Sequence, residues 1–104
     1  MKHFIKKHLT EVKWPSPADD WDVEGVLKDR LNQNFKYDLR PIKNNMKIGH
    51  FKTKAEKIVF DINHQYIIVD VEELHQYLKE NKVNEVNLGD LLSKLDWNII
   101  LPKI

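Results

Sequence analysis

Side chains that could carry catalytic or metal-binding chemistry are few in this sequence, and none stands at a recognised spacing. The chain has no cysteine, which excludes thiol catalysis, thiolate-based zinc sites and disulfides. No histidine is paired with a second histidine or an acid at a metal-ligand spacing such as HExxH. We therefore expect no metal and no cofactor. The histidines are His3, His8, His50, His64 and His75.

Nucleophilic and phosphate-binding chemistry also lack a signature. The serines and threonines have no context such as GxSxG, and three glycines are too few for a glycine-rich phosphate loop. Glu11-Val12-Lys13 matches only the short acid-x-lysine piece of a metal-dependent nuclease motif. These absences favour a non-enzymatic protein, although they leave the question open.

One segment, residues 36–57, has the composition of an anion-binding surface. It carries seven lysines and arginines against two acids, with aromatic residues between them. Basic side chains bind phosphates and aromatic rings stack on unpaired bases, so the segment could bind nucleic acid. A histidine within it could also serve as the base of a metal-free ribonuclease toxin. The other interpretation is a solvated strand edge, on which lysines discourage strand pairing. The candidate residues are Arg40, Lys43, Lys47, His50, Lys52 and Lys54.

Three tryptophans are the candidates for a protein interface: Trp14, Trp21 and Trp97. Tryptophan is a favoured anchor of interfaces, and Trp14 precedes Pro15 in a stretch that could leave it exposed. A basic segment at 36–57 and an acidic one at 61–96 would help to orient a partner. The alternative is that all three rings cover the core.

Composition predicts one folded domain over residues 1–104. The chain is 41% hydrophobic and 32% charged, with a formal net charge of +1, as in ordinary globular proteins. No stretch approaches the roughly 18 consecutive apolar residues of a membrane span. The basic N-terminal segment lacks the apolar core of a signal peptide. We therefore expect a cytoplasmic protein that does not enter a membrane.

The most informative stretch is residues 57–70, which predicts a β-hairpin with Asn63 and His64 in the loop. That register pairs Lys57 with Asp70 at the open end, and side chains alternate between the two faces of the ribbon. One face then carries Ile58, Phe60, Ile67 and Val69, and the other carries Val59, Asp61, Tyr66 and Ile68.

A helix is predicted directly after the hairpin, over residues 71–80. Asp70 is a good N-cap, and Glu73 stands three residues later, as in a capping box. Val69 and Leu74 have the spacing of a hydrophobic staple. Asn81 is expected to end the helix in a left-handed conformation.

The remaining elements follow from shorter patterns. Ser16, Pro17 and Asp19 resemble the start of a helix, which is predicted over residues 17–34. Alternation predicts a strand at 35–40, and Asn44-Asn45 predicts a turn. Asn87 can cap a short helix at 88–95, and an apolar strand is expected at 97–101. Residues 2–12 predict a short helix or strand with a basic side.

Together these elements predict an α+β fold: a small two-layer sandwich of three to five antiparallel strands, with two or three helices packed on one face. For function we expect a small non-catalytic protein that binds another protein, as an inhibitor, an immunity or antitoxin-like partner, or an adaptor. The alternative is a nucleic-acid-binding protein that uses residues 36–57. The apolar strand at 97–101 leaves both a monomer and an edge-paired homodimer open.

Overall fold

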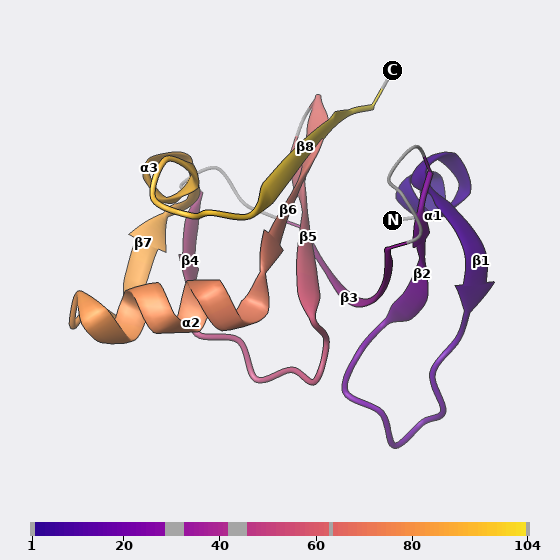
Figure 1. The fold of residues 1–104 in the computed structure, drawn as a ribbon, viewed down its shortest axis with the longest axis horizontal. Coiled ribbons are helices and arrows are strands. Elements are labelled where there is room, and N and C mark those ends of the chain that lie inside the picture. Colours follow the sequence, from indigo (N-terminus) through magenta and orange to yellow (C-terminus); the bar gives the residue numbers. More distant parts are fainter. Residues whose placement is uncertain (1, 29–32, 42–45, 63, 104) are drawn as a thin grey trace.

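The computed structural model describes residues 2–28, 33–41, 46–62 and 64–103. Six strands form one curled sheet, in which one pair of neighbouring strands is parallel and all other neighbouring pairs are antiparallel (Figure 1). In spatial order they are β1 (Leu9–Lys13), β2 (Val23–Leu27), β3 (Asn34–Pro41), β5 (Lys57–Ile62), β6 (Gln65–Asp70) and β8 (Asn98–Pro102).

The hairpin of β5 and β6 lies inside this sheet, with the predicted register. Lys57 pairs with Asp70 at one end and Ile62 with Gln65 at the other, which confirms the alternation of faces. The ribbon is buried on both sides, because each face contributes to a separate hydrophobic cluster. Of the two predicted loop residues, Asn63 lies outside the described residues.

One face of the sheet is covered by α2 (Val71–Glu80), α3 (Leu88–Leu92) and a two-stranded sheet of β4 (Lys47–Gly49) and β7 (Glu85–Asn87) (Figure 1). Both helices begin at the predicted caps. Asp70 accepts a hydrogen bond from the Glu73 backbone at 2.9 Å, and Asn87 accepts one from the Asp90 backbone at 3.3 Å. The predicted left-handed stop at Asn81 is wrong, because Asn81 is right-handed and the positive φ of 55° falls on Lys82.

The predicted helix over residues 17–34 is wrong in the parts that are described. Ser16 and Asp19 form a tight turn instead, and strand β2 follows with every second residue buried. The carboxylate of Asp19 accepts from both the backbone and the hydroxyl of Ser16 at 3.0 Å, a pattern that a sequence cannot distinguish from a helix cap. Gly25 in β2 lets β1 approach, because a Cβ there would lie 3.2 Å from the Thr10 carbonyl oxygen.

The opposite face of the sheet is closed by the N-terminal segment, which forms helix α1 (Lys2–His8) followed by β1. Phe4 is fully buried there and packs edge-on against Tyr37 and Tyr66. Helices therefore lie on both faces, and the sheet has six strands with a parallel β3–β5 pair. The α+β class is confirmed. The prediction of an all-antiparallel sheet with helices on a single face is wrong.

Two further expectations concern the closing strand and the turn at Asn44-Asn45. The closing strand forms at Asn98–Pro102, one residue later than predicted, and pairs with β6 at the edge of the sheet. The turn at Asn44-Asn45 lies outside the described residues. In the part of the chain that is described, no helix has the length and apolar character needed to cross a membrane.

Candidate functional site

The three tryptophans have three different environments. Trp14 follows edge strand β1 and is 67% exposed. Trp21 is half-buried, with the ammonium of Lys36 5.6 Å from its ring centroid. Trp97 is also half-buried and packs against the second hydrophobic cluster. Only one of the three predicted anchors thus presents most of its surface to solvent.

The backbone on both sides of Trp14 is constrained. Before it, β1 is irregular between Thr10 and Lys13, and Glu11 has a φ of 53°, a left-handed conformation that is uncommon outside glycine. After it, the Ser16–Asp19 turn fixes the chain, and its hydrogen bonds hold the pKa of Asp19 below its ordinary value. Trp14 is therefore an exposed aromatic side chain on a short segment anchored at both ends.

Trp97 belongs instead to a cluster around a buried ammonium group. Lys57 is only 7% exposed, and its Nζ lies 3.9 Å from the Trp97 ring centroid and 4.5 Å from that of Phe35. The same atom donates to Asp70 Oδ1 at 2.7 Å. A buried lysine needs such partners, because removing its charge from water is costly. The Lys57 cluster explains the burial of Trp97 without any partner molecule.

Glu73 connects this cluster to helix α2. Its carboxylate does not complete the predicted capping box; it accepts from the backbone of Asp96 at 2.8 Å and of Trp97 at 2.9 Å. The start of α2 therefore holds the segment that leads into β8. The sequence predicts only a local role for Glu73 in the capping box, and nothing in the local pattern indicates its contacts with Asp96 and Trp97.

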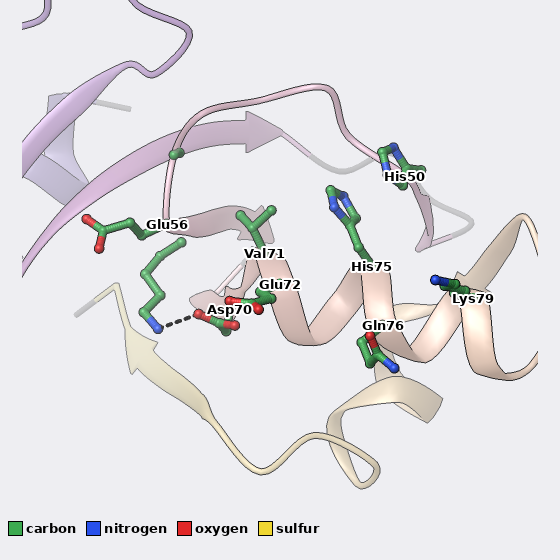
Figure 2. A pocket seen from close by; sticks show the side chains of 10 residues that line it. His50, Glu56, Asp70, Val71, Glu72, His75, Gln76 and Lys79 are labelled. Atoms are coloured by element: carbon green, nitrogen blue, oxygen red, sulfur yellow. Dashed lines mark hydrogen bonds and ion pairs between the residues drawn. The ribbon is translucent and has the colours of Figure 1, made fainter.

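A groove runs along one side of α2, between the helix and residues 49–56. Figure 2 shows one cleft of this groove, with a volume of about 740 Å³, and an adjoining cleft of about 770 Å³ shares His50, His75 and Lys79 with it. The rings of His50 and His75 stack with centroids 3.7 Å apart. The Phe51 backbone donates to His75 Nε2 at 3.1 Å, so the ring proton of neutral His75 is on Nδ1.

This environment favours the neutral form of His75. Burial, with a smaller contribution from the positive charge of His50, lowers the pKa of His75 below its ordinary value of 6.5. The cleft in Figure 2 is also lined by three acids and two lysines, so both signs of charge face it: Glu56, Lys57, Asp70, Glu72 and Lys79. Mixed charge gives the groove no preference for an anionic ligand.

The structure disperses the predicted anion-binding residues. Arg40 forms a two-point contact with Asp38, at 2.9 and 3.0 Å, and this carboxylate raises the pKa of Arg40. Lys47 lies 3.6 Å from Glu85 on the neighbouring strand. His50 belongs to the groove beside α2, and Lys43 lies outside the described residues.

The part of the basic segment around residues 52–54 packs against the aspartate-rich residues 19–22. Thr53 and Lys54 bond the Asp20 carbonyl, both at 2.9 Å, which joins the two segments. A small cleft of about 240 Å³ is formed there, and burial beside Asp38 raises the pKa of Asp22. The segments thus neutralise each other in part. The cleft is lined by Asp19, Asp20, Trp21, Asp22, Asp38, Arg40 and Lys52.

Within residues 2–28, 33–41, 46–62 and 64–103, no group of three or more histidines and acids is arranged to hold a metal ion. Comparisons with protein-family models, with curated proteins and with solved structures find no match for this chain.

Proposed function

We propose that this protein acts by binding another protein, without catalysis, and that Trp14 is the anchor of the interface. The observation that carries the proposal is the 67% exposure of Trp14, in a chain whose other two tryptophans pack against lysine side chains. A buried tryptophan is among the strongest contributors to interface affinity. Leaving this ring in water is unfavourable unless a partner covers it.

The fixed backbone around Trp14 supports the same function. Ordering a flexible segment on binding reduces affinity, and a segment that is already ordered avoids this cost. Here the irregularity in β1 and the Ser16–Asp19 turn hold Trp14 from both sides. The exposed residues around it carry both signs of charge, among them Glu11, Lys13 and Asp19, so the matching partner surface is an apolar pocket with a polar rim.

The alternative, binding of nucleic acid through residues 36–57, receives less support. Arg40 is engaged by Asp38, and Lys52 shares its cleft with four aspartates. Negative charge at this density weakens the attraction of phosphates. The alternative stays a prediction and is kept as a competing outcome of the experiment below.

The experiment is site-specific photocrosslinking in the source cells. Trp14 is replaced by a benzoylphenylalanine residue, and the control carries the same group at Val83, which is 42% exposed at a distant site. We expect one protein adduct that depends on position 14. Two results together would favour nucleic-acid binding over protein binding. The first is the absence of that adduct, and the second is salt-dependent retention of RNA that is lost in the double variant Lys52→Glu/Lys54→Glu.

A further inference from the structure

The two edges of the six-stranded sheet differ in their protection against pairing with another chain. Edge strand β1 has an irregular register and exposes Thr10, Glu11 and Lys13, and both features discourage a further strand. Edge strand β8 has a regular register with β6 and contains no charged residue. Ile100 on β8 is 48% exposed. The edge at β8 is therefore open to a further strand.

The backbone groups that face outward from β8 can be assigned. In an antiparallel pair, residues alternate between those that bond the neighbouring strand and those that point away. Lys103 donates from its backbone to His64 at 3.1 Å, so Ile99 and Leu101 also bond inward, toward β6. The N–H and C=O groups of Asn98 and Ile100 consequently face the open edge.

Pro102 agrees with this assignment, because it has no N–H and occupies an outward-facing position. The ring of His8, at the end of α1, lies beside this part of the backbone. Apart from the Pro102 carbonyl, the outward-facing groups of the edge are thus equal numbers of donors and acceptors, all on Asn98 and Ile100.

We propose that this edge pairs with a second copy of the chain, with the two β8 strands antiparallel around a two-fold axis at Ile99. Asn98 of each copy then lies opposite Ile100 of the other, and each such pair exchanges both of its hydrogen bonds. This register satisfies every outward N–H and C=O of the two residues and leaves the contact between Pro102 and His8 in place. It also covers the exposed side of Ile100.

The charges at the two ends of β8 are complementary between two antiparallel copies. Asp96 precedes β8 and Lys103 follows it, and Lys103 already forms an ion pair with Asp61. In the proposed register Asp96 of one copy lies opposite Pro102 of the other, next to Lys103, so each end of the pair combines an acid with a base, whereas parallel pairing would place like charges together. Two-fold pairing of this kind is the commonest symmetry of protein dimers.

Cysteine crosslinking tests the register, since the natural chain contains no cysteine. Residues opposite each other at the axis have Cα atoms roughly 4.5 Å apart, within the range of a disulfide. Ile99→Cys is therefore expected to give a covalent dimer under mild oxidation, while the matched Val83→Cys variant stays monomeric. A crosslink in Ile100→Cys but not in Ile99→Cys would overturn this pairing.

The oligomeric state of the full chain is the second test, measured by sedimentation over a dilution series. We expect a reversible dimer in the unchanged protein and in Val83→Lys, and a monomer in Ile100→Pro, which lacks an edge donor. Circular dichroism shows whether Ile100→Pro remains folded. Ile100→Lys is a second variant, which changes the exposed side chain but keeps the backbone N–H. A natural chain that is monomeric at every concentration would overturn the proposal. Because Trp14 lies at the opposite edge, this result leaves the proposed function untouched.

Discussion

The ammonium of Lys57 lies 2.7 Å from one carboxylate oxygen of Asp70, while the other oxygen of Asp70 caps helix α2. One side chain therefore neutralises a buried charge and starts a helix. Lys57 begins β5 and Asp70 ends β6, so the contact closes the open end of the central hairpin. Trp97 and Phe35 complete the surroundings of the ammonium group.

The two halves of this pair are expected to respond differently to mutation. Asp70→Ala leaves the buried ammonium without a counterion and removes the cap, which we expect to lower the free energy of unfolding by about 3 kcal/mol. Lys57→Met retains the apolar contacts and leaves a carboxylate that still caps α2, so its cost should stay below about 1.5 kcal/mol. Urea denaturation measures both. Equal losses in the two variants would contradict this account of the pair.

The carboxylate of Glu73 is expected to be important well beyond its own helix. Glu73→Ala leaves the N–H groups of Asp96 and Trp97 without acceptors, at a cost of about 1–3 kcal/mol. Hydrogen exchange at these two amides should accelerate as well. Glu72→Ala, on the same helical turn but exposed, is the matched control and should stay within about 0.5 kcal/mol of the natural chain. Similar effects at the two positions would rule out the proposed link.

Protonation of His75 is expected to make stability depend on pH. Its pKa is lowered in the folded protein, so below the ordinary value of 6.5 the unfolded chain takes up more protons. Stability should therefore fall as the pH decreases through about 6.5 and should be unaffected by His75 at higher pH. His75→Gln should weaken this dependence, whereas His64→Gln, at an exposed position, should leave it unchanged. Thermal melts from about pH 7.5 to about pH 5.5 provide the measurement.

The parts of the fold that sequence predicts well are stabilised by local interactions. The hairpin register follows from alternation over residues 57–70, and the caps at Asp70 and Asn87 act within three residues. The failure at residues 17–34 is also local, because the Asp19 carboxylate accepts from the Ser16 backbone in this turn, as it would in a capping box at a helix start. The alternation of Val23, Gly25 and Leu27, all buried, is the signal that would have indicated a strand.

Other features depend on contacts between distant residues. Nothing in residues 35–40 indicates that this strand lies parallel to β5, because the direction of pairing is set by the intervening chain and by packing on both faces. The separate burial of Trp21 and Trp97 likewise depends on lysines at 36 and 57. The exposure of Trp14 could be predicted from its proline-flanked segment. The sequence could not predict that the other two tryptophans would be half-buried.

Binding through Trp14 is tested most directly by the affinity of the purified partner, once crosslinking has identified it. Trp14→Ala should raise the dissociation constant by at least about 30-fold, as expected for the loss of an anchor that contributes about 2 kcal/mol or more to binding. Its free energy of unfolding should change by less than about 0.5 kcal/mol, because the ring is exposed. Val83→Ala is the control and should leave the affinity unchanged. An unaltered dissociation constant in Trp14→Ala would contradict the central proposal.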